Sequence, residues 1–361
     1  MESKNFIKAG VLAFILIIIF LISWEAYWRS NKFPVSYNDD ASLWSTKRKE
    51  VYKPADAATI FIGSSRIKYD LDIPTWQNIT GEKAIQLAMV GTSPRPLLAD
   101  LANDKEFRGK LIIDVTEGLF FGRNKKRTEK SAVEGIEYYK KWTPAQKFSA
   151  RINYFLESQF VFLDKDKFGL NELISEIGNP KRKGVFERPH FPKGFGLTSA
   201  QRQSFMAESF LCDTMQQKRQ QQNWLITGGA SDRSLGIKGD SLEMIFKEVK
   251  EAIDKIRGRG GKVLFVRTPS SGTYLETEQL VYPRQKYWDA LLAYTNTPGI
   301  YFKDYPGLAS FICPEWSHLK PADAIVFTKN LIEILRLEKG WNFPQNHITT
   351  LNNSKISNHG F

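Results

Sequence analysis

Two short segments, about 250 residues apart, hold the residues best suited to chemistry. Residues 62–65, Ile-Gly-Ser-Ser, place a serine at a glycine-containing turn directly after an apolar run. Residues 315–318, Glu-Trp-Ser-His, place a carboxylate and an imidazole three residues apart. A serine hydroxyl is a poor nucleophile until an imidazole accepts its proton and a third group orients that imidazole. The pattern predicts Ser65 as nucleophile, His318 as base and Glu315 as the orienting carboxylate.

The assignment of the base rests on the small number of histidines. The chain has four, His190, His318, His347 and His359. The last two lie in a polar C-terminal stretch, and the first lies among prolines and an arginine. His318 is therefore the best placed to act as a base. The alternative without catalysis makes His318 a surface histidine, the serine a helix cap and the glutamate a charge near a helix.

Short apolar runs bounded by Gly or Pro indicate the strands that must position these residues. Five such runs lie at residues 58–62, 84–90, 110–115, 262–266 and 299–302. Runs of this length fit strands buried on both faces of a parallel sheet. Predicted helices lie between or after them, at residues 94–101, 242–256, 287–294 and 321–337. The alternation predicts a three-layer α/β/α domain over residues 56–340 with right-handed crossovers.

The candidate residues fall at the carboxyl ends of these strands, where open α/β sheets bind ligands. Ser65 follows the first strand, Gly91 the second and Thr116 the third. Glu315 and His318 lie in the loop after the fifth strand, just before the last helix. We therefore expect all five residues to meet at one edge of the sheet. Backbone N–H groups at the serine turn would bind a developing oxyanion there, although the glycine has a simpler interpretation as a turn residue.

Three arginines also fall at strand ends near the predicted site: Arg66, Arg95 and Arg267. They are candidates for binding an anionic substrate or acyl carrier. The carboxylates considered as structural partners for them are Asp70, Asp72 and Asp114. We favour the structural interpretation, in which ion pairs rather than substrate occupy the guanidinium groups.

Residues 120–239 interrupt the strand–helix alternation. This stretch contains predicted helices at residues 132–141 and 145–159, a loop rich in Pro, Gly and basic residues at 179–196, and a Gln-rich helical segment at 199–224. The insertion has three interpretations: it caps the strand ends, it forms a surface for a partner, or it contributes only to stability.

Composition excludes several classes of function. The chain has 361 residues and a formal charge of +12, but its basic residues are scattered and match no nucleic-acid-binding motif. Affinity for an anionic membrane surface or an acidic polymer is the more modest interpretation. Cys212 and Cys313 are the only cysteines, so at most one disulfide can form. No zinc spacing and no nucleotide-binding motif is present, and we expect neither a metal nor another cofactor.

The N-terminus predicts a membrane anchor over residues 1–28. Residues 9–24 form an uncharged apolar run that follows Lys4 and Lys8 and reaches spanning length with its aromatic flanks. The expected interfacial anchors are Trp24, Tyr27 and Trp28. Bulky residues follow the run where a cleavable signal needs small ones, so we expect an uncleaved single-pass anchor. A cleaved signal peptide is the alternative.

Charge around the anchor bears on its orientation. The lysines before the apolar run place the N-terminus in the cytoplasm and the domain outside it, although Arg29 and Lys32 flank the other end. Residues 29–55 are expected to be a polar linker, and residues 341–361 a polar tail.

In register with this strand order, four blocks resemble the SGNH/GDSL-type hydrolases. In that family a serine follows the first strand in a Gly-Asp-Ser motif, a glycine and an asparagine after the next two strands serve the oxyanion hole, and Asp-x-x-His completes the triad. Here residues 63–66 read Gly-Ser-Ser-Arg, which aligns Ser65 with the nucleophile, and Gly91 aligns with the glycine. Residues 114–117 have no asparagine, and residues 315–318 have glutamate in place of aspartate.

The resemblance covers roughly residues 56–338 without the insertion. It implies a flavodoxin-like domain and an oxyanion hole at Ser65, Gly91 and Thr116. The Gly-Ser-Ser variant with an N-terminal anchor is similar to proteins of alginate O-acetylation and of lipoteichoic acid D-alanylation. The implied activity is that of a serine esterase or O-acyltransferase, working outside the cytoplasm on ester groups, chiefly acetyl, of a carbohydrate or envelope polymer. The implied partners are the lipid bilayer, the acylated polymer and a membrane-bound O-acyltransferase.

A catalytically silent scaffold is the alternative from a different class. The missing asparagine and the substituted aspartates are compatible with a tethered binding protein of an envelope-modification complex. The discriminating observation is whether Ser65, His318 and Glu315 lie within hydrogen-bond reach of one another, because a scaffold has no need of that geometry. We expect no nucleic-acid partner, since the anchor would hold the domain away from cytoplasmic nucleic acid.

Overall fold

Five parallel strands form the central sheet of the computed structural model, which describes residues 2–52, 57–122, 125–170, 173–174, 190–227 and 236–344. The strands are β1 (Ala58–Ile62), β2 (Lys83–Gln86), β3 (Lys110–Asp114), β6 (Lys262–Arg267) and β7 (Gly299–Tyr301). Their order across the sheet is β2-β1-β3-β6-β7, and every neighbouring pair is parallel. Each predicted apolar run therefore holds a strand, although β2 ends at Gln86 rather than continuing to residue 90.

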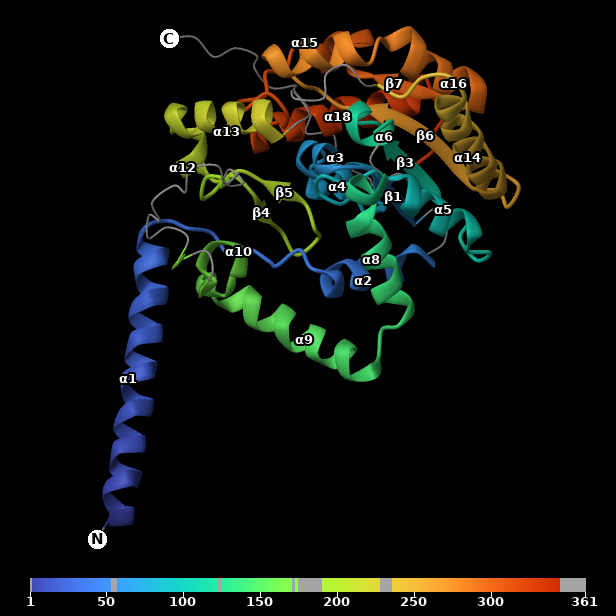
Figure 1. Ribbon diagram of the computed structural model, residues 1–361. Helices are drawn as coiled ribbons and strands as arrows, with labels where there is room; N and C mark the ends of the chain where they lie inside the picture. The colour runs from blue at the N-terminus through green and yellow to red at the C-terminus, as the bar shows by residue number, and fades with distance from the viewer. Residues whose placement is uncertain are drawn as a thin grey trace, which may run out of the picture.

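Helices cover both faces of this sheet (Figure 1). One group consists of α3 (Ser65–Asp70), α4 (Ile73–Thr80) and α18 (Pro321–Leu337), which pack against one another. The other consists of α5 (Arg95–Asn103), α14 (Asp240–Arg257) and α16 (Ala290–Thr295). Because both faces are covered, every residue of β1 and β3 is buried, which explains the apolar residues at the centre of each strand. The α/β class expected from the sequence is confirmed.

Shorter elements complete the C-terminal half of the chain. They are α15 (Gly272–Val281), a π-helical turn (Gln285–Asp289) that leads into α16, a 3₁₀ turn (Phe302–Asp304) and α17 (Pro306–Ala309). The helix expected at residues 287–294 is thus a π turn followed by an α-helix. Residues 341–344 do not begin a polar tail, because Trp341 and Phe343 are buried in the hydrophobic core. Residues 345–361, with His347 and His359, lie outside the described residues.

The segment expected to be a polar linker, residues 29–55, is in part folded against the domain. It contains α2 (Ala41–Arg48) and a 3₁₀ turn (Lys49–Tyr52). The indole of Trp44 is buried and donates a hydrogen bond to Leu87 O at 3.0 Å. Polar and charged residues gave the segment its linker-like composition, but Leu43, Trp44 and Val51 are buried in the domain, so the expectation was wrong for residues 41–52.

The insertion carries most of the remaining elements. They are α6 (Glu117–Phe120), α7 (Lys125–Thr128), α8 (Lys130–Lys140), α9 (Pro144–Gln159), a 3₁₀ turn (Val161–Leu163), α10 (Lys165–Phe168), β4 (Leu197–Thr198), β5 (Ser204–Phe205), α12 (Glu208–Leu211) and α13 (Thr214–Thr227). The expected helices at 132–141 and 145–159 are confirmed as α8 and α9.

The Gln-rich segment at residues 199–224 is not one helix, which corrects the sequence prediction. Its first part forms the turn of the β4–β5 hairpin, where Arg202 adopts a left-handed conformation with φ of 67°. Two α-helices follow the hairpin, the short α12 and then α13, which begins at Thr214. Most of the expected loop at 179–196 lies outside the described residues.

One long apolar helix, α1 (Glu2–Ser30), extends from the domain (Figure 1). Its segment Asn5–Ser30 is long and apolar enough to cross a membrane, and none of it is buried by the rest of the protein. At about 1.5 Å per residue, a helix of this length exceeds the roughly 30 Å hydrocarbon layer of a bilayer. It meets the physical requirements of a membrane anchor or of a signal sequence.

Candidate active site

The turn after β1 presents Ser65 at the start of α3. Gly63 must be glycine, since a Cβ at this position would lie 2.5 Å from Asp114 Cβ on the neighbouring strand. Ser64 caps α3, with its hydroxyl 2.6 Å from Thr116 Oγ1 and 3.2 Å from Asp114 Oδ2. The hydroxyl of Ser64 therefore stabilises the turn. Ser65, in contrast, is only half-buried, and its side chain remains accessible.

The loop before α18 positions the other two residues of the predicted triad. Glu315 Oε1 accepts hydrogen bonds from the backbone N–H groups of Ser317, at 3.2 Å, and of His318, at 2.6 Å. One residue further, Leu319 donates its N–H to the buried carboxylate of Asp70 on α3 at 2.9 Å. These bonds tie the loop to the helix that begins at the serine, so segments distant in sequence are held side by side.

The three side chains form one hydrogen-bonded chain. Ser65 Oγ lies 2.9 Å from His318 Nε2, and His318 Nδ1 lies 3.1 Å from Glu315 Oε1. His318 is 1% exposed and Glu315 is fully buried. An ionised carboxylate can only accept, so Nδ1 of the neutral ring carries the proton and Nε2 is left to accept the proton of Ser65. This is the arrangement that activates a serine hydroxyl.

Aromatic side chains enclose the imidazole, and two of them come from the insertion. The ring of Tyr69 lies 4.3 Å from that of His318 between centroids, and those of Phe195 and Trp224 lie 5.8 Å away. Trp224 also donates its indole N–H to Glu315 Oε2. Burial raises the pKa of the Tyr69 phenol, so this side chain stays neutral. The insertion therefore contacts the candidate site, in line with its interpretation as a cap.

Sequence reasoning did not identify these aromatic residues as part of the site. Nothing in the spacing of Phe195 or Trp224 distinguishes them from other aromatic residues of the insertion. Their placement depends on how the β4–β5 hairpin and α13 fold back over the sheet edge. The N–H of a partly buried tryptophan usually finds a hydrogen-bond partner, and here that partner is the carboxylate of Glu315.

The predicted oxyanion-hole residues lie at the ends of their strands. Gly91 occupies an exposed turn after β2 with φ of 63°, a conformation that favours glycine. Thr116 is buried, and its hydroxyl donates to Asp114 Oδ2 at 3.1 Å in addition to its contact with Ser64. The threonine hydroxyl thus belongs to the support of the serine turn. The assignment of the backbone N–H groups of Ser65, Gly91 and Thr116 to an oxyanion hole stays a prediction.

Two of the three candidate arginines form a buried charge cluster behind the site. Arg66 contacts Glu278 Oε1 at 2.5 Å, and its Nε lies 3.4 Å from Ser317 Oγ. Arg267 contacts Glu278 Oε2 at 2.6 Å and Glu117 Oε1 at 3.0 Å. Burial would raise the pKa of Glu278, but the charges of the two arginines outweigh burial and lower it. These guanidinium groups serve the fold, as favoured from the sequence.

The partners of the arginines differ from those considered in the sequence. Asp70, Asp72 and Asp114 form none of the described ion pairs with them, and glutamates fill that role. Arg95, on α5, pairs instead with Glu129 at 2.7 Å. Sequence proximity suggested the aspartates, whereas Glu278 reaches the cluster only because α15 packs over the sheet edge.

The described residues hold no cluster of three or more His, Cys, Asp or Glu side chains suited to a metal ion. Both cysteines are free, with Cys212 exposed and Cys313 buried close to the site. Burial raises the pKa of the Cys313 thiol well above its ordinary value, so the thiol is held protonated and packs as a small apolar group.

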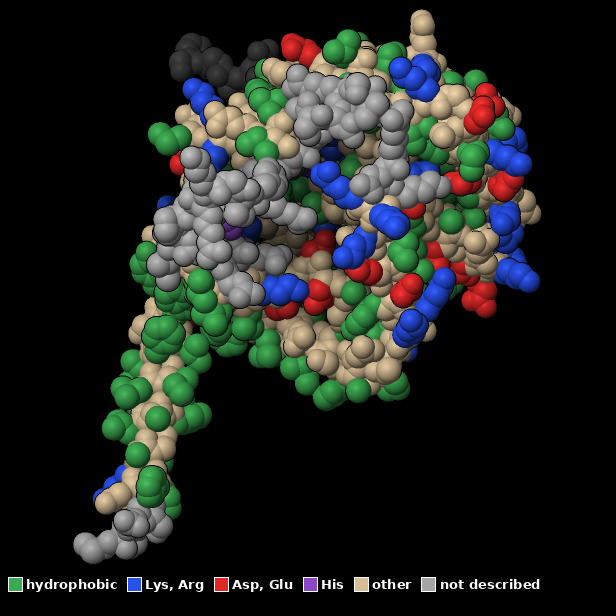
Figure 2. All heavy atoms as spheres, viewed as in Figure 1, with side chains coloured by type: hydrophobic (Ala, Val, Ile, Leu, Met, Phe, Trp, Pro, Cys, Tyr) green, Lys and Arg blue, Asp and Glu red, His purple; other side chains and the backbone are tan. Residues whose placement is uncertain are grey.

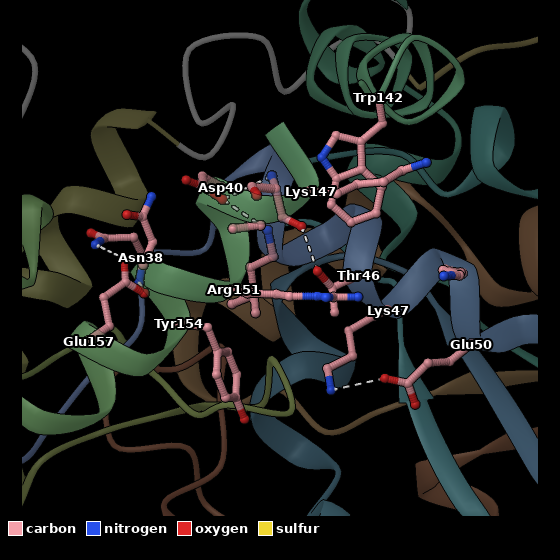
Figure 3. A pocket seen from close by; sticks show the side chains of 15 residues that line it. Asn38, Asp40, Thr46, Lys47, Glu50, Trp142, Lys147, Arg151, Tyr154 and Glu157 are labelled. Atoms are coloured by element: carbon pink, nitrogen blue, oxygen red, sulfur yellow. Dashed lines mark hydrogen bonds and ion pairs between the residues drawn. The ribbon is translucent and has the colours of Figure 1, made fainter. Parts of the chain in front are cut away.

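A cavity of about 390 Å³ lies away from the predicted triad, between α2 and α9 (Figure 3). Its lining includes Lys47 and Thr46 from α2 and Lys147, Arg151 and Tyr154 from α9. The lining contains no member of the predicted triad, so we do not assign the predicted reaction to this cavity.

No protein-family model matches the chain, and no curated protein sequence matches it. The functional interpretation therefore depends on the geometry of Ser65, His318 and Glu315 and on the arrangement of the elements that hold them.

Proposed function

We propose that this protein is a membrane-anchored serine esterase or O-acyltransferase of the SGNH type. The observation that carries the proposal is the hydrogen-bonded chain from Ser65 through His318 to Glu315. Its two inner members are buried, while the serine hydroxyl stays accessible. A silent scaffold has no need to keep three such side chains in this arrangement.

In the proposed mechanism, His318 Nε2 takes the proton of Ser65 as the serine oxygen attacks the ester carbonyl carbon. Glu315 stabilises the imidazolium that forms, through the hydrogen bond to Nδ1. The imidazolium then protonates the departing alkoxide, which leaves an acyl-enzyme. Water or a sugar hydroxyl attacks this intermediate with His318 again as base, giving hydrolysis in the first case and acyl transfer in the second.

Strand order supports the SGNH assignment. Numbered along the chain within the central sheet, the order is 2-1-3-4-5, which is that of flavodoxin-like folds. Ser65 follows the first strand and His318 precedes the last long helix, the positions that SGNH hydrolases use for their nucleophile and base. The family assignment stands on this order together with the chemistry of the two segments.

The proposed location is the outer side of a membrane, with α1 as an uncleaved anchor. Lys4 and Lys8 precede the apolar segment and favour a cytoplasmic N-terminus. Glu25, near the end of α1, accepts hydrogen bonds from the backbone of Val161 and Phe162. These contacts between α1 and the domain support the proposal that α1 is retained after membrane insertion. The proposed substrate is an acetylated carbohydrate or envelope polymer, and the proposed partner is a membrane-bound O-acyltransferase.

The test is labelling of the detergent-solubilised full chain with a fluorophosphonate probe. We expect labelling of the wild type and its loss in Ser65→Ala and His318→Ala. Ser310→Ala, at an exposed serine, is the matched control and should label like the wild type. Thermal unfolding of each variant confirms that it is folded. Unchanged labelling of Ser65→Ala, or absence of labelling in a well-folded wild type, would overturn the proposal and favour the scaffold.

A further inference from the structure

Helix α9 carries an apolar stripe that the described part of the protein leaves uncovered. Phe148, Ile152, Phe155 and Leu156 are 66%, 44%, 62% and 37% exposed. Their spacing of three and four residues puts them on one side of the helix. Within α9 no residue is classed as buried, although the helix has 16 residues and a complete capping box at Thr143. A contiguous exposed apolar stripe of this kind is typical of a surface that contacts a membrane or another protein.

The side of α9 towards α2 is polar, and its basic residues Lys147 and Arg151 remain exposed. Lys147, Arg151, Tyr154 and Glu157 line the cavity against α2 (Figure 3). The ammonium group of Lys147 lies 5.5 Å from the ring centre of Trp142. With basic side chains beside an apolar stripe, α9 has the pattern of helices that lie in the plane of a membrane interface.

The C-terminal end of α9 is fixed to the end of α1. Arg29 donates a hydrogen bond to Gln159 O, the last residue of α9. The carboxylate of Glu25 accepts from Val161 N at 3.0 Å and from Phe162 N at 3.2 Å. Glu25 and Arg29 follow the apolar part of α1, where a spanning helix leaves the hydrocarbon layer. With α1 in a bilayer as proposed, the end of α9 would lie at the level of the membrane surface.

The whole helix lies on the side of the domain from which α1 extends (Figure 1). Hydrophobic side chains gather along this edge of the molecule and continue onto α1 (Figure 2). The apolar surface of the proposed anchor and that of α9 therefore border the same space. A bilayer that surrounds α1 reaches α9 without any rearrangement of the domain.

We propose that α9 is an interfacial membrane helix whose stripe of Phe148, Ile152, Phe155 and Leu156 inserts into the bilayer that α1 spans. The occupant is lipid: the acyl chains receive the aromatic and aliphatic groups, and the head groups meet Lys147 and Arg151. The inference rests on retention of α1 as an anchor, but not on the activity of Ser65. Two attachments would fix the orientation of the domain, where a single helix would leave it free to rotate.

The test places an environment-sensitive nitrobenzoxadiazole probe on the full-length protein in vesicles of phosphatidylcholine and phosphatidylglycerol. Cys212→Ser removes the exposed native thiol, and Phe155→Cys supplies the labelling site. Asn153→Cys, exposed on the cavity side of the same helix, is the matched control. Lipids that carry a nitroxide on the acyl chain should quench the probe at position 155 about threefold more than at 153, and iodide should show the opposite preference.

Equal lipid quenching at the two positions would overturn the proposal. Protection of position 155 from iodide without lipid quenching would also overturn it, and would indicate contact with another copy of the chain. Ile152→Cys provides a second site on the stripe if the first variant does not fold. Because the readout requires no catalysis, its failure is separate from failure of the proposed esterase activity.

Discussion

At the residue scale, both oxygens of Glu315 are occupied, and each has a separate function. Oε1 holds the loop backbone and the imidazole of His318, while Oε2 accepts from Trp224. A charge that merely lay near a helix would be exposed, whereas this carboxylate is fully buried. The indole thus acts on the proposed base through the carboxylate, as a positioning residue outside the proposed triad.

Trp224→Phe should slow the proposed reaction without unfolding the site. The variant keeps an aromatic ring but leaves Glu315 Oε2 without its donor. The carboxylate is then held less firmly, and it favours a protonated imidazole in the free enzyme, which cannot accept the proton of Ser65. We expect kcat/KM for an aryl acetate ester to fall about tenfold, or about 1.4 kcal/mol. We also expect the acidic limb of its pH profile to move to higher pH.

Trp142→Phe is the control for this variant, because the indole N–H of Trp142 has no hydrogen-bond partner in the described part of the chain. It should leave both kcat/KM and the pH profile unchanged. An unshifted profile in Trp224→Phe would show that the tryptophan is only a packing residue.

At the element scale, buried charges join segments that backbone hydrogen bonds do not connect. Arg66 on α3, Arg267 at the end of β6 and Glu278 on α15 meet in one cluster behind the serine turn. Removing one member of a buried ion pair leaves an uncompensated charge, and typically costs about 3–5 kcal/mol. The cluster therefore couples the stability of α15 to that of the site.

Glu278→Gln should lower the free energy of unfolding by about 3–5 kcal/mol, because two buried guanidinium groups lose their shared carboxylate. The measurement is urea unfolding of the solubilised full chain. Glu276→Gln, an exposed glutamate on the same helix, should change stability by no more than about 0.5 kcal/mol. Equal effects of the two substitutions would contradict a structural function for the cluster.

A second ion-pair cluster joins the segment before α2 to α3 and to the β4–β5 hairpin. Asp39 contacts Arg202 at 2.6 Å and also pairs with Lys68. Burial alone would raise the pKa of Asp39, but the charges of Arg202 and Lys68 outweigh burial and hold it well below its ordinary value of 3.8. The folded state therefore keeps this carboxylate ionised under conditions in which the unfolded chain takes up a proton.

Stability should accordingly fall as the pH drops below about 3.8, since only the unfolded state then binds the proton. Above that pH the contribution of Asp39 is fully present. Asp39→Asn should be less stable at neutral pH, by up to about 3 kcal/mol, and should lose part of this acid dependence. Urea unfolding of both proteins between pH 3 and pH 7 provides the measurement, and parallel pH curves would refute the prediction.

At the scale of the whole molecule, α1 is bonded to the domain rather than merely joined to it. Besides the bonds of Glu25 and Arg29, the ring of Trp28 packs 4.5 Å from that of Phe168 on α10. Cleavage after residue 28 would remove Glu25 and Trp28 from these contacts. The arrangement favours an anchor that stays attached.

We expect the protein isolated from membranes to have the mass of the whole chain, 41.4 kDa. It should also remain with the membrane after washing in alkaline carbonate, which strips peripheral proteins. Intact-mass spectrometry checks the first expectation and sedimentation the second. A product that lacks about 28 N-terminal residues would identify α1 as a signal peptide instead.

The sequence was most informative about features that depend on neighbouring residues in the chain, such as strands and helices. Apolar runs located all five strands of the sheet, because a strand covered on both faces is largely apolar. Residues 321–337 were predicted as a helix and form α18 with the same limits. Ser65 and His318 could be paired in advance, since parallel strands bring their carboxyl ends to one edge.

Tertiary structure alone decided which residues support these elements. The distances between Ser65, His318 and Glu315 depend on how two loops pack. The position of Trp224 next to Glu315 depends on the fold of the insertion. The composition of residues 41–52 suggested a linker, but burial of Trp44 and the ion pairs of Arg48 with Asp100 and Asp104 hold that segment to the domain. The pattern of apolar residues in a segment predicts the conformation of that segment. Ion pairs and ring contacts between distant segments depend on tertiary packing, which the periodicity of apolar residues does not predict.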